Sequence, residues 1–587
     1  MSQAIPQAAL PPAAGAVNGA GAKGLVRAAP DRAGAAARWT ALAIAAATAV
    51  SALLLAAHLN PYLGDYGDDA EFLILGQGLA RGQGYAWVNS PPPAGAWGPS
   101  GSEGGGPWPA HNRYPPGYPA LLAAAMVVTS THADAQTAIV PAKLVTAATF
   151  LLSIGVLWPL ARRRLPAPSA AAAVALYALN PFAIRFATQV MSDAPFILAA
   201  LAALAWADRL AGVRGQGSGV REGRAENPAL STQYSGLWDW IVLGVLLAAA
   251  SYVRSVGVVL AGGVLLWAWW RTRRAGRTRW AVAALTTYAA LMLPWWIRDA
   301  TLAGGWRYLE ELLAARYQSP AEGVAGPGDL VARAADNALF VLDKPGVYGA
   351  AGFAAAGAAA LAVGLGYWRA VRQAGGAAEW AAVLLILAVL IWPIKSGRYL
   401  LPVLPLVGIY FIGGTPSLQG RRAWPRVVAA GGVLAVVLFE AAYSARDAAG
   451  NLRALAAAGG GGAAGYYQDR PEWAHYLQAA DWLRGNAGRD DVALARRHFA
   501  LYVYSGRHTD KYRFDVTEDE LAYLLAGTAR KFVVEDAFDY LRGDFAPLPA
   551  ALRARGGDLV LRFQTAEPAV RVWELVRPPG ACCAPRA

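Results

Sequence analysis

The feature that most constrains this chain is a series of apolar runs long enough to cross a lipid bilayer. A helix needs about 20 apolar residues to span about 30 Å of hydrocarbon. Hydrophobic residues make up 56% of the 587 residues and charged residues only 16%, which excludes a single soluble core. We predict eleven membrane-spanning helices, at residues 39–59, 137–160, 167–184, 191–208, 237–253, 256–270, 280–297, 346–366, 379–394, 398–414 and 427–444.

The basic residues between these runs predict the orientation of the chain. Arginines cluster in alternate connections, for example at 162–164 and 271–279, and basic residues concentrate on the cytoplasmic side of membrane proteins. We therefore predict a multi-pass protein of a cell inner or plasma membrane with a cytoplasmic N-terminus. An apolar segment at 119–129 is short, and letting it cross would invert this pattern, so we expect it to be interfacial or re-entrant. The net charge of +13 is spread over these clusters, which favours contact with membrane lipids and no binding of nucleic acid.

The fold class predicted is mainly α, a polytopic membrane helix bundle of about 11 transmembrane helices followed by an extracytoplasmic α/β domain. A Gly/Pro-rich section at 90–109, within the first external loop, is expected to be mobile. The predicted parts are a disordered cytoplasmic tail at 1–38, a membrane domain at 39–445 with its first external loop at 60–136, a Gly/Ala linker at 446–466 and the α/β domain at 467–587. Within that last domain we predict helices at 471–486 and 518–525 and strands at 492–495, 501–504, 532–534, 559–563 and 570–576.

Common signatures of soluble enzymes are absent from the sequence. It contains no P-loop, no GxGxxG motif after a strand, no HExxH and no GxSxG. Its two cysteines, Cys582 and Cys583, are adjacent near the C-terminus, so they cannot form a disulfide framework. The six histidines show no metal-ligand spacing, and we predict that they are scattered surface or interfacial residues.

An acidic cluster directly after the first apolar run is the strongest functional signal. Asp65, Asp68, Asp69 and Glu71 lie within seven residues, on a helical pattern that would hold them against the membrane. Charges near lipid are costly unless they face water or perform a function. An ordinary solvated loop is the structural alternative, and we favour a functional site.

Other charged residues are predicted on the same membrane face. Asp193 stands at the mouth of one helix, and basic residues follow three others, namely Arg254, Arg298, Lys395 and Arg398. Carboxylates and cations at one interface suit transfer from a lipid-linked phosphate, with cations stabilising the leaving phosphate and a carboxylate accepting a proton. Each basic residue alone also fits a side chain that reaches the lipid headgroups, and Asp193 fits a helix N-terminus.

These residues belong to segments that resemble a known family. The segments are DDAEF at 68–72, LARGQGY at 79–85, RYPPGYP at 113–119, SDAPF at 192–196, YVR at 252–254, PWWIR at 294–298 and GRYLLP at 397–402. Their order is similar to that of landmarks in the C-superfamily (GT-C) membrane glycosyltransferases of the protein O-mannosyltransferase and aminoarabinose-transferase (ArnT) type. The resemblance covers residues 39–445. The chain departs from the family pattern at Asp69, where Glu is common, and in its Gly/Pro-rich insertion.

The resemblance implies an inverting glycosyltransferase of the cell envelope. Such an enzyme moves a hexosyl or pentosyl group, as mannosyltransferases do, from a polyprenyl-phosphate sugar donor to a protein, lipid or glycan acceptor outside the membrane. It implies catalytic roles for three acidic residues, with Asp68 as general base beside Asp69 and Asp193. The substrate-binding residues that it implies are Glu71, Arg113, Tyr114, Tyr118, Arg254, Arg298, Lys395, Arg398 and Tyr399. No cofactor is assigned, and participation of a divalent cation stays open.

Two other classes of function remain open at this point. A transporter or flippase of lipid-linked sugars also tolerates charges at membrane depth, but such folds usually show paired repeats and polar groups near the bilayer midplane. We find no such repeat, and the charges collect at one interface. A non-catalytic glycan-binding membrane protein is the second alternative.

Overall fold

A computed structural model describes the chain between residues 29 and 576. The segments outside the described residues are 65–66, 91–110, 112, 212–235, 303–309, 311, 315–323, 344–348, 374, 416–422, 460–461, 513–517, 526–528 and 539–544. The expectation of mobility for 90–109 therefore falls almost entirely outside the described residues, as do Asp65 and the first part of the predicted tail.

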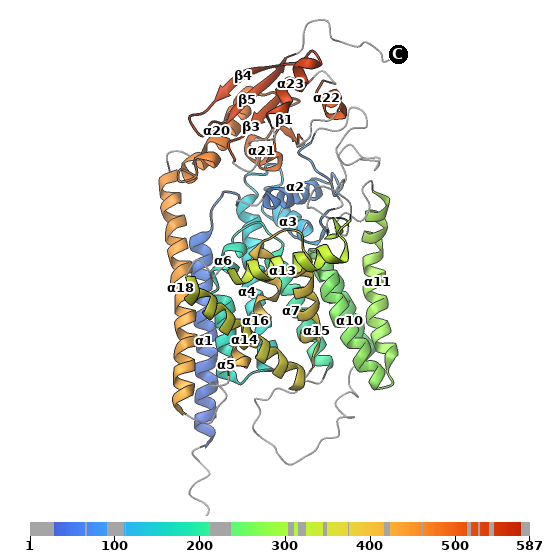
Figure 1. Cartoon of the computed structure of the whole chain (residues 1–587), viewed down its shortest axis with the longest axis vertical. Coiled ribbons are helices and arrows are strands. Elements are labelled where there is room, and N and C mark those ends of the chain that lie inside the picture. Colours follow the sequence, from blue (N-terminus) through green and yellow to red (C-terminus); the bar gives the residue numbers. More distant parts are fainter. Residues whose placement is uncertain are drawn as a thin grey trace, which may run out of the picture.

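Long helices form a bundle that carries a small α/β domain at one end (Figure 1). Within the described residues, five helical stretches are long and apolar enough to cross a membrane, or six if one bent pair is counted, so the predicted number of eleven is not confirmed. The five stretches are Ala37–His58, Ile139–Arg162, Thr278–Thr301, Gly397–Gly414 and Val427–Ala458. They make this a multi-pass membrane protein.

These stretches correspond to elements labelled in Figure 1. They lie in α1 (Ala29–His58), α4 (Ile139–Arg162), α11 (Thr278–Thr301), the short 3-10 helix η3 (Gly397–Val403) continued by α16 (Leu404–Gly414), and α18 (Ala423–Ala458). The bundle further contains α7 (Asp193–Leu210), α9 (Leu237–Val253), α10 (Gly257–Arg274), α13 (Pro327–Asp343), α14 (Gly349–Gln373) and α15 (Ala377–Ile391).

Two helices extend beyond their predicted ends. Helix α1 begins at Ala29, inside the segment predicted to be a disordered tail, and α18 continues to Ala458, inside the segment predicted to be a linker. Both extensions are rich in alanine, which has the highest helix propensity and prolongs a helix that has already formed. The short helix α19 (Gly462–Tyr466) follows α18.

The span predicted at 167–184 is a broken helix. Helices α5 (Ala167–Ala178) and α6 (Pro181–Ala187) meet at an angle of 53° because Pro181 lacks the backbone N–H that would continue α5. The side chain of Asn180 caps α6 by accepting a hydrogen bond from the Ala183 N–H at 3.0 Å. Hydroxyl groups from two neighbouring helices satisfy carbonyl groups at the break: Ser51 of α1 donates to Ala178 O, and Ser444 of α18 donates to Leu179 O.

Two short helices of the segment predicted to be the first external loop lie between the bundle and the α/β domain (Figure 1). They are α2 (Asp68–Ala80), which carries the acidic cluster, and α3 (Gly117–Val128), which falls on the segment predicted to be interfacial or re-entrant. The helices approach closely, since a Cβ atom at Gly76 of α2 would lie 3.0 Å from the side chain of Leu122. This close approach packs α2 directly against α3.

The C-terminal domain contains a five-stranded sheet in the order β2-β1-β3-β5-β4. Strands β1 (Val492–Leu494), β2 (His508–Asp510) and β3 (Lys531–Glu535) are parallel, whereas β5 (Arg571–Val576) runs antiparallel to both β3 and β4 (Asp558–Gln564). The helices are α20 (Pro471–Asn486), α21 (His498–Ser505), α22 (Glu518–Leu525) and α23 (Pro547–Ala554).

One strand prediction in this domain is wrong. Residues 501–504, Leu-Tyr-Val-Tyr, favour a strand by composition but belong to α21, which ends at the left-handed Gly506. All four side chains are buried, and Tyr502 donates a hydrogen bond to Gln77 of α2 at 3.2 Å. Tertiary packing against the external loop therefore overrides local β propensity.

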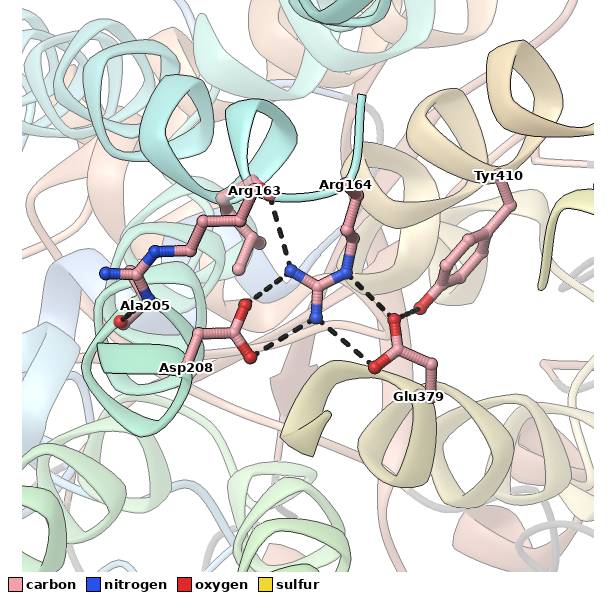
Figure 2. A network of polar contacts seen from close by, with 7 residues as sticks. Arg163, Arg164, Ala205, Asp208, Glu379 and Tyr410 are labelled. Carbon is pink, nitrogen blue, oxygen red and sulfur yellow. Dashed lines mark hydrogen bonds and ion pairs between the residues drawn. The ribbon is translucent and has the colours of Figure 1, made fainter. Parts of the chain in front are cut away.

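A buried ion cluster lies at the end of the bundle opposite the α/β domain. Figure 2 shows the Arg164 guanidinium between the carboxylates of Asp208 at the end of α7 and Glu379 at the start of α15. The Arg164 side chain is 4% exposed, and Tyr410 donates a further hydrogen bond to Glu379 at 3.3 Å. In the sequence, Arg164 indicated only which connections face the cytoplasm. In the structure, its side chain joins three parts of the bundle.

Candidate functional site

Four charged side chains form one continuous chain of ion pairs at the end of the bundle that faces the α/β domain. Asp68 Oδ2 accepts from Arg398 Nη1 at 2.7 Å, and Arg398 Nε donates to Asp193 Oδ2 at 2.9 Å. The other oxygen of Asp193 accepts from Arg254. The four residues come from four separate regions of the sequence, and all four were predicted as site residues.

Element ends bring these residues together. Asp68 and Asp193 are the first residues of α2 and α7, where the positive end of the helix dipole favours a carboxylate. Arg254 directly follows α9 with an extended backbone, and Arg398 is the second residue of η3, whose cap residue is Ser396. Residues predicted on one membrane face therefore meet because their helices begin or end at the same level.

This chain of ion pairs borders a cavity in which about 100 Å³ is accessible to water-sized molecules. Asp68 lines the cavity and keeps 33% of its side-chain surface exposed, whereas the Asp193 side chain is only 1% exposed and is absent from the lining. Further lining residues include Arg113, Tyr114, Arg254, Arg398, Trp392 and Tyr399. The cavity thus presents one carboxylate and three guanidinium groups.

The surroundings of Asp68 keep it ionised. Burial raises its pKa, but the positive charges of Arg398 and Arg113 and a hydrogen bond from Tyr114 outweigh this effect and hold the pKa below its usual value. Tyr114 donates to Asp68 Oδ1 at 3.1 Å, and burial raises the tyrosine pKa well above its usual value, so the phenol keeps its proton. Asp68 can accept a proton from a hydroxyl group that enters the cavity.

Two other acidic residues of α2 do not line the cavity. Asp69 is 1% exposed and accepts from the backbone N–H groups of Gly64 and Ala70, and burial raises its pKa to about 6. Glu71 is 4% exposed and accepts from Trp87 Nε1 at 3.2 Å, and burial raises its pKa to about 7. Of the described acidic residues in the cluster, Asp68 alone reaches the cavity.

The remaining predicted substrate-binding residues divide into two groups. Arg113, Tyr114 and Tyr399 line the cavity. The other three are absent from the lining: Tyr118 is buried with its hydroxyl 2.8 Å from Thr146 Oγ1, Arg298 donates to the carbonyl oxygens of His111 and Tyr85, and Lys395 forms an exposed pair with Asp336 at 3.2 Å.

Sequence reasoning missed several residues around this site. His111, predicted as a surface or interfacial residue, is 0% exposed and contacts Glu71 and Tyr114. Trp87 contacts Glu71, and Trp392 lines the cavity beside Tyr399. Only His111 carried a signal in the sequence, since it lies two residues before the RYPPGYP segment.

The site does not fit a divalent cation that bridges the carboxylates of Asp68 and Asp193. Arg398 lies between Asp68 and Asp193 and bonds to both, so its guanidinium occupies the position a bridging metal would need. Among the residues that the structure describes, no group of three His, Cys, Asp or Glu side chains has a metal-binding arrangement. Positive charge at this cavity comes from arginine, and we assign no step to a metal.

Comparison with known proteins gives matches in structure only. No family model and no curated protein matches the sequence. The apo crystal structure of ArnT from Cupriavidus metallidurans matches with a TM-score of 0.52 and 15% identity, over 92% of this chain and 98% of that chain. Archaeoglobus fulgidus oligosaccharyltransferase tethered to an acceptor peptide with the NVT sequon matches with a TM-score of 0.55 and 11% identity, over 91% and 74% of the two chains.

A second structure of the Archaeoglobus fulgidus enzyme, AglB in complex with an inhibitory peptide and a dolichol-phosphate, matches with a TM-score of 0.52 and 10% identity, over 93% of this chain and 75% of that chain. These matches include the membrane bundle and extend over most of the C-terminal part. They confirm the fold class predicted from the sequence, a mainly α membrane helix bundle with a C-terminal α/β domain, and this chain shares the fold of the ArnT and AglB structures.

Proposed function

We propose that this protein is a membrane glycosyltransferase that moves a sugar from a polyprenyl-phosphate donor to an acceptor hydroxyl on the extracytoplasmic side. The observation that carries the proposal is the cavity in which one reachable carboxylate, Asp68, adjoins the guanidinium groups of Arg254 and Arg398. The match to an enzyme structure that contains a dolichol-phosphate supports a donor of this kind.

The reaction that suits this arrangement is a single inverting displacement. The acceptor oxygen forms a bond to the anomeric carbon, while the bond from that carbon to the phosphate oxygen breaks. Asp68 accepts the proton that the acceptor loses, and the polyprenyl phosphate leaves with the electron pair of the broken bond. A positioned general base contributes about 100- to 10,000-fold to such a step.

Arg254 and Arg398 stabilise the leaving phosphate, because guanidinium groups bind phosphate oxygens strongly in a partly dry site. Asp193 acts as a positioning residue, since its buried carboxylate bonds to both arginines and does not reach the cavity. A phosphate bound at Arg398 also brings negative charge near Asp68. That charge raises the pKa of Asp68 and makes it a stronger base when the donor is present.

The uncharged walls of the cavity suit the sugar. Tyr114 and Tyr399 offer aromatic faces with hydroxyl groups, and Trp392 lies against Tyr399 with a ring separation of 5.6 Å. Sugars with apolar faces and several hydroxyl groups match such walls. The proposal covers hexosyl and pentosyl donors and protein, lipid or glycan acceptors.

The test is donor turnover by the purified protein in lipid nanodiscs. The donors are a panel of polyprenyl-phosphate sugars with radiolabelled hexose, pentose or amino sugar, and a cell-envelope extract supplies acceptors. We expect release of polyprenyl phosphate together with transfer of label to the extract, and loss of both in Asp68→Asn. A parent protein that consumes no donor, but moves labelled donor across sealed vesicles, would be a flippase, and the proposal would be wrong.

A further inference from the structure

We propose that His111 is a positioning residue that acts through Tyr114 on the carboxylate of Asp68. This inference deepens the proposed function and rests on it. The contacts that carry it form a buried path from Glu71 through His111 and Tyr114 to Asp68.

Tyr114 determines how Asp68 is presented to the cavity. Arg398 and Tyr114 each bind one oxygen of the carboxylate, at 2.7 and 3.1 Å, so together they fix its rotation. The remaining lone pairs of Asp68 then point in a defined direction for an incoming hydroxyl group. An error of about 1 Å in such a group lowers reaction rates by about 100-fold.

The backbone of Tyr114 is in turn held by two side chains. Its N–H donates to His111 Nε2 at 2.7 Å, and its carbonyl oxygen accepts from the Tyr85 hydroxyl at 2.8 Å. The imidazole also stacks on the Tyr114 ring, with centroids 5.5 Å apart. The position of the Tyr114 phenol therefore depends on a histidine that is itself 0% exposed.

The hydrogen bond from Tyr114 defines the state of the histidine. An Nε2 atom that accepts a hydrogen bond carries no proton, so a neutral ring has its proton on Nδ1. Glu71 Oε1 lies 3.6 Å from that Nδ1, longer than a hydrogen bond, so Glu71 favours the Nδ1–H tautomer only by electrostatic attraction. The contact that requires this tautomer is the hydrogen bond from the Tyr114 N–H.

The α/β domain closes this buried path from outside. Trp87 donates to Glu71, its ring lies 5.1 Å from that of His111, and on its other side Phe499 of α21 lies 5.9 Å away. Asn89, two residues along from Trp87, is bonded to Thr509 of β2 in both directions. The C-terminal domain therefore supports the base through the external loop.

The experiment compares two substitutions of His111, each of which keeps a polar atom near the position of one of the two ring nitrogens. Glutamine places an acceptor oxygen near the position of Nε2, whereas asparagine places its amide near Nδ1 and leaves the Tyr114 N–H without the acceptor. We expect His111→Gln to keep the transfer rate near that of the parent, and His111→Asn to lower the maximal rate about 10- to 100-fold with little change in donor KM. In a double-mutant cycle, His111→Asn should cost nothing further once Tyr114→Phe has removed the phenol.

Amide hydrogen exchange provides a readout that does not need turnover. We expect faster exchange of the Tyr114 amide in His111→Asn and parent-like protection in His111→Gln. Equal losses of rate in the two variants, or effects of His111→Asn and Tyr114→Phe that multiply, would overturn the inference and assign His111 to packing alone. If the parent protein consumes no donor while the exchange result appears as expected, the proposed function fails, and the contact from His111 to Tyr114 stands.

Discussion

Asp193 and Asp208 lie at opposite ends of α7, and replacing each by asparagine separates the role of the cavity ion pairs from that of buried ion pairs in general. Both aspartates are 0% exposed, and both bind arginine. Asp193 bonds to Arg254 and Arg398 at the cavity, whereas Asp208 bonds to Arg164 in the cluster of Figure 2. The two substitutions are therefore matched in helix, burial and chemistry and differ in location.

The two variants should lose stability to a similar extent. Removing one partner of a buried ion pair costs about 3–5 kcal/mol, because the other charge stays buried without full compensation. Their effects on transfer should differ. Asp193→Asn removes the carboxylate that holds both guanidinium groups proposed to stabilise the leaving phosphate, while the bond from Arg398 to Asp68 stays. Loss of such preorganisation lowers the rate about 100- to 1,000-fold. Asp208→Asn should leave the transfer rate per folded molecule close to that of the parent.

The assay is initial release of polyprenyl phosphate by purified variants in nanodiscs, at a temperature well below the Tm of each variant. The amount of folded protein is taken from the monodisperse fraction in size-exclusion chromatography. If Asp208→Asn loses as much activity as Asp193→Asn, the loss follows from stability and not from the cavity. If Asp193→Asn transfers at the parent rate, the arginines do not need this carboxylate and the reasoning is refuted.

Four further predictions follow from the site. Asp68→Asn should reduce transfer at least about 100-fold. Asp69→Asn should reduce it less, because the Asp69 side chain does not line the cavity. Initial transfer rates check this order, and the reverse order would assign the general base to Asp69. Arg254→Gln should cost a few kcal/mol, on the order of 100-fold in rate, while an arginine that only contacts headgroups would cost little. Burial raises the pKa of Glu71 from 4.5 to about 7, so its contribution to stability is present below pH 4.5 and is lost as the pH rises through 7. Glu71→Gln should therefore raise the Tm relative to the parent at pH 8 and not at pH 4.5. The gain in unfolding free energy at pH 8 has an upper limit of about 3 kcal/mol. Because Arg398 occupies the position between the carboxylates, a chelator should leave the transfer rate unchanged, and a rate restored only by added Mg²⁺ or Mn²⁺ would contradict this prediction.

The sequence by itself determined the membrane class, the mainly α fold and the four charged residues that form the chain of ion pairs. Long apolar runs have few ways to satisfy their backbone polar groups in lipid, so helices follow directly from composition. The charges of Asp68, Asp193, Arg254 and Arg398 stood out because each interrupts or borders an apolar run. These signals depend only on neighbouring residues, so they can be recognised without the tertiary structure.

Only the tertiary structure decided which of these charges meet. It separated Asp68, which reaches the cavity, from Asp69, its immediate neighbour, because successive residues of a helix point in different directions. It showed Asp193 buried behind both arginines, and it placed Arg298 on backbone carbonyl groups outside the cavity lining.

The contact of His111 with Glu71 and the helical state of residues 501–504 also depend on partners outside their own segments. The sequence places His111 just before the RYPPGYP segment but does not show that its side chain meets Glu71, 40 residues earlier. Residues 501–504 adopt a helix because their side chains pack against α2. Tyr502, for example, contacts Gln77, which lies more than 400 positions earlier in the sequence. Contacts between distant segments exist only once the chain is packed, and for that physical reason the arrangement of the site could not be obtained from local sequence patterns.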